Sequence, residues 1–211
     1  MKLYIYEHCP FCARVAFVAN ALNLDLEYQV VDYADANTLI DLIGKKMVPV
    51  LEKDDGTVMA ESLDIIALFI EQAGLDTTHQ PSEAVLAFQQ QAFPLVQGIG
   101  YPRYTRLGLK EYPTQASHEA WRAKKETPEL NFERLLAETD HLVSQVNERL
   151  VSAQQLLEIE QGQSALSLVD QAVMFSLLRV FYAESSIEWP EDLQQWMEKN
   201  AAKEGATLLR A

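Results

Sequence analysis

The spacing of apolar residues changes character near residue 75. Before this point, short strand-like apolar runs take turns with stretches of helical spacing. After it the strand pattern vanishes and only long helical patterns follow, so we predict an α/β unit joined to a helical unit. Strands are predicted over 2–6, 26–31, 48–52 and 57–59, and helices over 10–23, 37–43, 62–73, 83–108, 115–126, 129–158, 168–183 and 191–203.

The first unit is predicted to have the element order βαβαββα. Asp55 and Gly56 separate its last two strands, and an Asp-Gly pair between apolar runs is a strong signal for a β-hairpin. This order gives a mixed four-stranded sheet covered by helices. We therefore assign residues 1–75 to an α/β domain, 76–82 to a polar linker and 83–211 to an all-helical domain.

The chain carries a net charge of −14, from 17 Lys and Arg against 31 Asp and Glu. Such a charge repels phosphate backbones and anionic lipid, so neither nucleic acid nor a membrane is an expected partner. The longest uncharged stretch, 84–102, is typical of a soluble helix because it contains four Gln, two Pro and two Gly. The apolar run after Lys2 is shorter than the roughly 7–15 residues of a secretory signal, so we expect a cytoplasmic protein.

Two cysteines, Cys9 and Cys12, form the motif Cys-Pro-Phe-Cys between a predicted strand and a predicted helix. Pro10 suits the first position of a helix, because it has no N–H to lose and its φ is already helical. Cys9 would then be the N-cap, where free backbone N–H groups and the helix dipole favour a thiolate. Cys12 lies one turn deeper. We therefore predict Cys9 as the nucleophile of thiol–disulfide exchange and Cys12 as the resolving thiol.

Two other interpretations of the cysteine pair stay open, a zinc site and a purely structural pair. Structural zinc takes four N or S ligands, whereas the chain has no second cysteine pair and its four His lack ligand spacing. The position between a strand and a helix favours the redox interpretation. We expect His8 to be a surface or packing residue rather than a base, and Arg14 either to support the thiolate or to point away.

Two further motifs are candidates for the same pocket. Pro49 follows Val48 at the start of a predicted strand, so it is either a plain strand start or part of a special geometry such as a cis bond. A cis bond would free the backbone of Val48 to pair with a peptide-like ligand. Glu61 and Ser62 precede an apolar helix, which Ser62 can cap and whose N–H groups attract a carboxylate.

These motifs together resemble the glutaredoxins, and more closely their larger two-domain bacterial type. The resemblance rests on residues 1–6, 8–12, 48–49 and 61–65, and by length and layout it covers essentially the whole chain. It implies a thioredoxin-like first domain, an all-helical second domain and a glutathione-transferase-like architecture. It also implies glutathione as co-substrate, with no metal and no bound organic cofactor.

By the same resemblance, Cys9 forms a mixed disulfide with glutathione. The backbone of Val48 pairs with the cysteinyl part of glutathione, beside a cis Pro49. Ser62 and Glu61 hold the γ-glutamyl end. The resemblance thus implies glutathione-binding residues Cys9, Phe11, Met47, Val48, Pro49, Glu61 and Ser62.

The chain departs from this pattern at the glycine end of glutathione. Many relatives carry a basic residue near the start of the second helix to meet the glycine carboxylate. Residues 32–37 contain no cation here. Lys45 or Lys46 could substitute for it.

Motifs in the helical half are assigned structural roles. Ser167 and Asp170 have the S-x-x-acid form of a capping box at the start of an apolar helix, with Asp in place of the commoner Glu. A second set of apolar residues is spaced for one helix face, and we assign it with the tryptophans to the core. These core residues are Leu135, Leu142, Val146, Leu150, Trp121, Trp189 and Trp196.

The leading hypothesis is a glutathione-dependent thiol–disulfide oxidoreductase. Its partners would be glutathione and glutathionylated or disulfide-bonded proteins, and the resemblance favours a monomer over a dimer. Two alternatives stay open, a glutathione transferase that conjugates electrophiles and a non-enzymatic interaction protein of the same fold. Conjugating transferases usually activate glutathione with a Tyr or Ser, and this chain has a Cys at that position, which argues against the first alternative. The presence of the cysteine pair argues against a purely non-enzymatic role.

Overall fold

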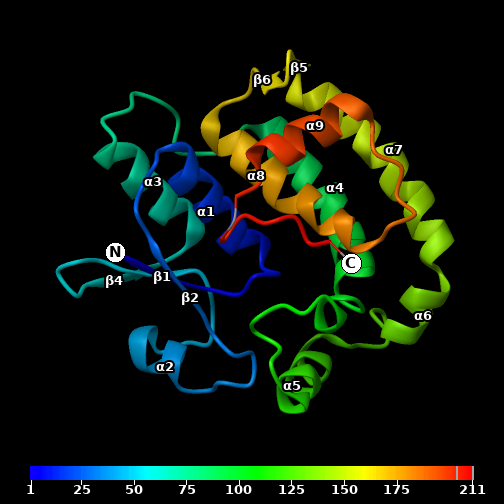
Figure 1. The fold of residues 1–211 in the computed structure, drawn as a ribbon, viewed down its shortest axis with the longest axis horizontal. Helices are drawn as coiled ribbons and strands as arrows, with labels where there is room; N and C mark the ends of the chain where they lie inside the picture. Colours follow the sequence, from blue (N-terminus) through cyan, green and yellow to red (C-terminus); the bar gives the residue numbers. More distant parts are fainter. Residues whose placement is uncertain (203, 211) are drawn as a thin grey trace.

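The structure is a computed structural model that describes residues 1–202 and 204–210. Figure 1 shows a small sheet with its helices beside a larger helical part. The first part follows the predicted βαβαββα order, which confirms the α/β assignment. Its elements are β1 (Lys2–Ile5), α1 (Pro10–Ala21), β2 (Glu27–Val30), α2 (Thr38–Ile43), β3 (Val50–Glu52), β4 (Val58–Ala60) and α3 (Ser62–Gln72).

The four strands form one mixed sheet in the order β2-β1-β3-β4. β1 pairs parallel with β2 and antiparallel with β3, and β3 pairs antiparallel with β4 as the predicted hairpin requires. Gly56 supplies the left-handed residue of that turn, at φ 79°. α1 and α3 lie on one side of the strands and α2 on the other (Figure 1). The site after β1 therefore lies at the carboxyl end of an inner strand.

The second part is helical apart from one short hairpin. No helix or strand lies between Gln72 and Glu83, and we propose 1–75, 76–82 and 83–211 as the division of the chain. The elements are α4 (Glu83–Gly100), η1 (Tyr104–Arg106), α5 (Gln115–Lys125), α6 (Phe132–Ala137), α7 (Thr139–Leu157), β5 (Ile159–Glu160), β6 (Gln163–Ser164), α8 (Leu168–Leu178), η2 (Arg179–Ala183) and α9 (Glu191–Asn200).

The hairpin β5–β6 was not expected in a domain predicted as all-helical. Glu158 ends α7 in the left-handed conformation, with φ 47°. Gln161 and Gly162 then have φ 51° and 72°, which is the pair of positive φ angles that a two-residue type I′ turn needs. The two strands on either side pair antiparallel. A local turn therefore produces strands too short to leave a visible alternation in the sequence.

Several of the long predicted helices end early or divide. The helix predicted over 168–183, for example, is α-helical to Leu178 and continues as η2. The helix predicted over 83–108 stops at Gly100, and η1 follows separately. The helix predicted over 129–158 divides at Glu138 into α6 and α7. The apolar residues that the sequence assigned to the core are nevertheless buried or packed against it, which confirms that assignment. These are Leu135 on α6, Leu142, Val146 and Leu150 on α7, and Trp121, Trp189 and Trp196.

Ser167 caps α8 as predicted, because its side chain accepts a hydrogen bond from the N–H of Asp170 at 3.1 Å. Asp170, however, does not complete a capping box. Its Oδ1 instead accepts a hydrogen bond from the N–H of Ser82 at 2.7 Å, which fixes the start of α4 to the start of α8. The side chain of Asp170 therefore links α8 to α4, two helices that are distant in the sequence.

The two parts share one hydrophobic core, with α1 in its middle. Every residue from Cys12 to Ala19 is buried, so α1 is covered on all sides rather than along one stripe. Phe17 contacts Phe175 of α8 at 5.1 Å between ring centroids. Near the end of the chain, a Cβ at Gly205 would lie 2.6 Å from the Cβ of Ala16, so only glycine permits this approach. The helical part is thus packed directly against the helix that begins beside Cys9.

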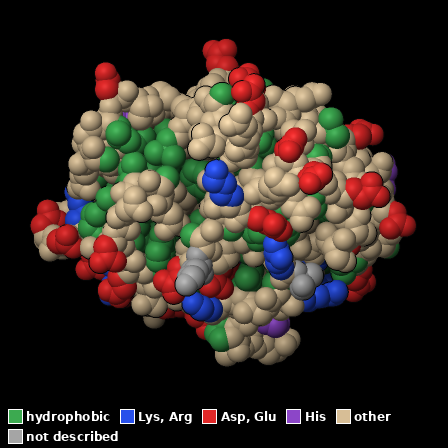
Figure 2. Space-filling model, turned by 45° about the horizontal axis from the view of Figure 1, so that its top comes forward, with side chains coloured by type: hydrophobic (Ala, Val, Ile, Leu, Met, Phe, Trp, Pro, Cys, Tyr) green, Lys and Arg blue, Asp and Glu red, His purple; other side chains and the backbone are tan. Residues whose placement is uncertain are grey.

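Acidic side chains are spread widely over the face shown in Figure 2, with fewer Lys and Arg among them. This agrees with the net charge of −14. Among residues 1–202 and 204–210, no helix is both long and apolar enough to cross a bilayer.

Candidate active site

Cys9 follows β1 and is the N-cap of α1, with Pro10 at the first helical position, as predicted. Its backbone is extended, at φ −70° and ψ 121°, and its carbonyl accepts the first helical hydrogen bond from Ala13 at 3.0 Å. The side chain of Cys9 is 7% exposed and that of Cys12 is 0% exposed. Of the two free thiols, Cys9 is therefore the one that a substrate can reach.

The two thiols differ in acidity. A hydrogen bond from the Cys12 side chain lowers the pKa of Cys9 to about 6, against the opposing effect of burial. The charge of His8 and the backbone N–H groups of Cys12 and Phe11 lower it further. Burial, followed by the interaction with Cys9, raises the pKa of Cys12 well above its ordinary value. Near neutral pH, Cys9 is therefore a thiolate and Cys12 a thiol that donates to it.

His8 is buried, which excludes the surface position and leaves the packing role that the sequence analysis allowed. Its ring stacks on Tyr104 at 4.9 Å and meets the edge of Trp121 at 4.7 Å between centroids. Its Nδ1 lies 2.7 Å from Oε1 of Glu111, which is fully buried. The residue next to Cys9 is therefore fixed by side chains of the helical part.

Two cavities meet beside Cys9. The first, here called the Ser62 cavity, measures about 480 Å³. The second, here called the Cys9 cavity, measures about 340 Å³ and shares Phe11, Met47 and Val48 with the first. Every glutathione-binding residue that the resemblance implied lies in one or both. The Ser62 cavity is lined by Phe11, Arg14, Met47, Val48, Pro49, Glu61, Ser62, Leu63, Asp64 and Gln80.

The peptide bond between Val48 and Pro49 is cis, as one of the two sequence interpretations required. The strand predicted over 48–52 begins two residues later, at Val50, so Pro49 lies just before the strand. Both residues line the Ser62 cavity. The backbone at this point therefore faces the space where a ligand would lie.

The expectation that Ser62 caps α3 is wrong, because the N-cap is Glu61 and Ser62 is already the first helical residue. The chain turns at Glu61 through φ 69°, a left-handed conformation that is strained for a residue other than glycine. The carbonyl of Glu61 accepts the first helical hydrogen bond from Ile65 at 3.0 Å. The buried hydroxyl of Ser62 is therefore not engaged in capping and lines the cavity.

Arg14 does not point away from the site. Its guanidinium lies 4.4 Å from the centroid of the Phe11 ring, and its side chain lines the Ser62 cavity. Burial lowers the pKa of Arg14 to about 10, while electrostatic interactions, first with Cys9 and then with Cys12 and Glu61, oppose this, so the group stays protonated near neutral pH. Its Nε is buried and makes no hydrogen bond to the described chain. Arg14 is thus a cation whose hydrogen-bonding capacity is not filled by the protein.

Three lysines line the Cys9 cavity: Lys46 from the α/β part, and Lys124 and Lys125 from α5. Lys46 donates to the carbonyl of Tyr33 at 2.5 Å. Lys125 lies 5.5 Å from the Tyr101 ring centroid. Within the described ranges, none of the three forms an ion pair with a carboxylate. Lys45 lines neither cavity, so Lys46 is the better placed of the two lysines considered from the sequence.

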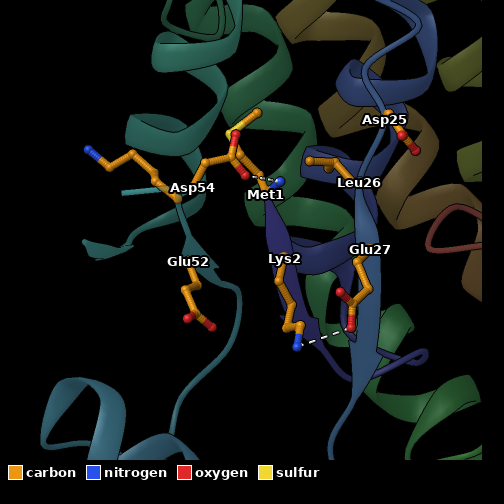
Figure 3. Close-up of a pocket in the computed structure, with 8 residues that line it drawn as sticks. Met1, Lys2, Asp25, Leu26, Glu27, Glu52 and Asp54 are labelled. Carbon is orange, nitrogen blue, oxygen red and sulfur yellow. Dashed lines mark hydrogen bonds and ion pairs between the residues drawn. The ribbon is translucent and has the colours of Figure 1, made fainter. Parts of the chain in front are cut away.

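Another hollow lies at the opposite end of β1, near Met1 (Figure 3). It measures about 440 Å³ and is lined by both acidic and basic side chains. Nζ of Lys2 lies 3.1 Å from Glu27, and the amino group of Met1 lies 2.7 Å from Asp54. These charges neutralise one another and no thiol is present, so we assign no chemistry to this hollow.

Sequence reasoning missed the part of the site that comes from the helical half. Glu111, Tyr104 and Trp121 surround His8, and Lys124 and Lys125 complete the wall of the Cys9 cavity. No local motif marks these residues. Elsewhere in the described chain, as here, no group of three or more His, Cys, Asp or Glu is arranged to hold a metal ion.

Comparisons with known proteins agree with this geometry. The family model described as glutaredoxin 2, C terminal domain, matches residues 84–211, and that of the glutathione S-transferase N-terminal domain matches residues 3–81. Glutaredoxin 2 of Escherichia coli K12 is 29% identical over 210 residues, which cover 99% of this chain and 98% of the relative.

Solved structures show the same similarity. Glutaredoxin 2 of Salmonella typhimurium in complex with glutathione has a TM-score of 0.87 and 28% identity, over 99% of this chain and 96% of that one. Gtt2 of Saccharomyces cerevisiae has a TM-score of 0.60 and 17% identity, over 99% of this chain and 100% of that one. The second likeness shows a shared fold alone.

Proposed function

The chain belongs to the glutaredoxin 2 family and acts as a glutathione-dependent thiol–disulfide oxidoreductase, and we propose that Cys9 is its nucleophile. The observation that carries this proposal is the position of the Cys9 thiol, at the start of α1 and in the wall of the Cys9 cavity, where its pKa is lowered to about 6. A thiolate is the attacking species in disulfide exchange. Cys12 is protonated and inaccessible, so it is not the first attacker.

With a protein–glutathione mixed disulfide as substrate, the Cys9 thiolate attacks the glutathione sulfur. The disulfide bond breaks, the protein leaves as a thiolate that takes up a proton, and Cys9 is left bonded to glutathione. The thiolate of a second glutathione then attacks that sulfur. Oxidised glutathione leaves and the Cys9 thiolate is restored. The net change consumes one free glutathione and releases one protein thiol, and the disulfide bond passes from the substrate to oxidised glutathione.

With a protein disulfide as substrate, Cys12 becomes necessary. Cys9 attacks one sulfur and forms a mixed disulfide with the protein, and Cys12, after losing its proton, displaces the second protein sulfur. The resulting Cys9–Cys12 disulfide is reduced by two glutathione molecules. The two cysteines lie one helical turn apart at the start of α1, which suits this second step.

The Ser62 cavity is proposed to hold the γ-glutamyl end of glutathione. Ser62 offers a hydroxyl that caps no helix, Arg14 offers an unsatisfied cationic donor, and Glu61 offers a carboxylate for the ammonium group. Charge-assisted hydrogen bonds of this kind are stronger than neutral ones. Val48, Met47, Pro49 and Phe11 form the wall between this end and Cys9.

The three lysines of the Cys9 cavity are proposed to hold the glycine carboxylate. Lys46 fills the role that residues 32–37 leave open, and Lys124 and Lys125 add two cations from the other half of the molecule. Their freedom from ion pairs within the described chain supports this, because an ammonium beside an apolar cavity favours an anionic ligand.

Mass spectrometry after addition of oxidised glutathione tests the assignment of ligand and nucleophile together. In Cys12→Ser, which cannot resolve the adduct, we expect one glutathione on Cys9. In Cys9→Ser we expect none on Cys12. The absence of an adduct from Cys12→Ser, or an equally fast adduct on Cys12, would contradict the proposal.

Conjugation of an electrophile to glutathione serves as the comparison reaction, because the first domain also matches the glutathione S-transferase model. Turnover of this substrate should be weak beside that of a glutathione mixed disulfide, because a Cys at this position bonds to glutathione rather than activating its thiol. The protein partners, the monomeric state and the cytoplasmic location stay predictions from the sequence.

A further inference from the structure

The mechanism leaves one buried acidic group without a task, the carboxyl group of Glu111. The residue belongs to the helical part, between η1 and α5, and it is 0% exposed. Its Oε1 accepts a hydrogen bond from the backbone N–H of His8 at 2.9 Å and lies 2.7 Å from Nδ1 of the same residue. Both contacts involve the residue that precedes the nucleophile.

Other hydrogen bonds fix the segment 110–112 to residues of the α/β part. The carbonyl of Glu111 accepts a hydrogen bond from the N–H of Tyr33 at 2.8 Å. The N–H of Lys110 donates to Oε2 of Glu7 at 2.8 Å, and the hydroxyl of Tyr112 lies 3.1 Å from Nδ1 of His8. The carboxyl group of Glu111 is therefore held in one place relative to Cys9.

The protonation state of this pair follows from its burial. A carboxylate removed from water is stable only beside a partner that carries positive charge. Within the described residues, His8 is the hydrogen-bonding partner of the Glu111 side chain. Burial alone would raise the pKa of Glu111, but the hydrogen bonds and charge of His8 lower it below its ordinary value. Glu111 is therefore a buried carboxylate held against the His8 ring.

Apart from the Cys9 thiolate, the titratable groups named next carry no negative charge toward His8. Arg179 donates to the carbonyl of Glu7 at 2.9 Å and stays protonated, because burial lowers its pKa only to about 10. Burial raises the pKa of each neighbouring tyrosine, so these groups are neutral. They are Tyr6, Tyr33, Tyr104 and Tyr112. Cys9, Lys46, Lys124 and Lys125 line the same cavity as His8, and the carboxylate of the adjacent Glu7 accepts from the N–H of Lys110.

The two ends of the pair act on different thiols. The charge of His8 lowers the pKa of Cys9, and the charge of Glu111 raises the pKa of Cys12. A buried pair with this orientation therefore favours one ionised thiol and one protonated thiol, in the order that the reaction needs.

We propose that Glu111 is a positioning residue for disulfide exchange: it holds the His8 ring beside Cys9, so that Cys9 rather than Cys12 is the thiol that reacts. The inference rests on the proposed role of Cys9 as nucleophile. It adds that the helical part, which supplies no thiol, adjusts the acidity of the reacting sulfur through a single side chain.

The test uses Glu111→Gln in the full-length chain, because glutamine keeps the size and hydrogen-bonding capacity and removes the charge. The readout is the rate at which iodoacetamide alkylates Cys9 as a function of pH, followed by mass spectrometry. We expect the midpoint to rise by about one pH unit, which makes alkylation about tenfold slower on the acid side and leaves it unchanged at high pH. A midpoint that does not move, or moves down, overturns the proposal.

Three further variants separate this role from a structural one. His8→Asn should raise the midpoint equally, and the double variant should add nothing. Glu111→Asp, which keeps the charge, should recover at least about half of the shift. Glu119→Gln, which removes an exposed carboxylate of α5, should leave the midpoint in place. Rates lowered equally at every pH would show a structural role and overturn the proposal.

Failure to fold does not leave the question open. If Glu111→Gln is unfolded, His8→Asn gives the decision, because the Cys9 midpoint moves only if the charge of His8 acts on it. Failure of the proposed function is recognised separately, since alkylation needs no activity toward disulfides. A protein that reduces no mixed disulfide but shows the shift would contradict the function and not the role of Glu111.

Discussion

The two halves of the molecule contribute to the site in different ways. The α/β half supplies the reacting groups from a short stretch of chain, with Cys9 and Cys12 at the start of α1. The helical half supplies no thiol, yet Glu111, Lys124 and Lys125 from this half lie around the nucleophile or line its cavity. One half therefore provides the chemistry, and the other sets the environment in which it occurs.

This difference shows which parts of a site a local sequence motif can predict and which it cannot. A nucleophile at a helix start needs only a few adjacent residues, because the backbone itself provides the N–H groups and the dipole. The surroundings of that thiol, in contrast, come from residues that are distant in the sequence and that folding brings beside it. His8 and Glu111 are 103 positions apart and still share two hydrogen bonds. The following predictions test how strictly the two contributions are divided.

The largest effect is expected for the thiols. Cys9→Ser should reduce the turnover of a glutathione mixed disulfide by about a thousandfold or more, because the attacking thiolate is lost. Cys12→Ser should keep this reaction and lose the reduction of protein disulfides. Steady-state assays with the two substrates measure both effects. Substantial turnover by Cys9→Ser would show that the chemistry does not belong to this part of the α/β half.

The next effect concerns pH. Because the pKa of Cys9 is lowered to about 6, its alkylation by iodoacetamide should be near its maximum at pH 7 and about tenfold slower at pH 5. The thiolate is lost as the pH falls through this value, so the rate falls with it. Alkylation of free glutathione, measured in parallel, should already be far below its maximal rate at pH 7, because its thiol is mostly protonated there.

The same measurement sharpens the comparison between the halves. The hydrogen bond from Cys12 is the largest cause of the low pKa of Cys9. Cys12→Ala, which removes this donor, should therefore shift the midpoint upward by more than Glu111→Gln does. The reverse order would mean that the helical half, and not the α/β half, dominates the acidity of the nucleophile.

A smaller effect is expected for the lysines of the Cys9 cavity. The pair Lys124→Gln and Lys125→Gln should raise the KM for glutathione by about three- to tenfold, since two cations near the glycine carboxylate are lost. Lys46→Gln should act in the same direction. Lys45→Gln is the matched control, because Lys45 is exposed and lines neither cavity. An unchanged KM in the double variant would remove the helical half from glutathione binding.

The smallest effect lies furthest from the chemistry. Ser167→Ala should lower the free energy of unfolding by about 0.5–2 kcal/mol, because α8 loses its N-cap hydrogen bond. Its KM and kcat should not change at room temperature, and Ser185→Ala, at an exposed position, should change nothing. Chemical denaturation measures the loss. A change in activity without a loss of stability would show that α8 acts on the site through α1.

The fold followed from the sequence in most of its elements. Apolar periodicity gave the βαβαββα order, and the Asp-Gly pair gave the hairpin of β3 and β4. Errors arose where one or two residues adopt an unusual backbone. Gln161 and Gly162 form a tight turn with positive φ, and Glu61 takes the capping position at φ 69°, which displaces Ser62 into the helix. Such choices depend on what surrounds the turn, and periodicity does not record them.

By itself, the sequence determined the helix start beside Cys9 and led us to predict Cys9 as the nucleophile and Cys12 as its resolving partner, because these inferences depend on neighbouring residues and on the backbone. Only the tertiary structure decided what faces that sulfur: the buried Glu111 behind His8, the lysines of α5 and the cavity that they complete. The physical reason is range. Hydrogen bonds to a helix start act over a few residues, whereas buried charges act through space on whatever the folded chain places beside them.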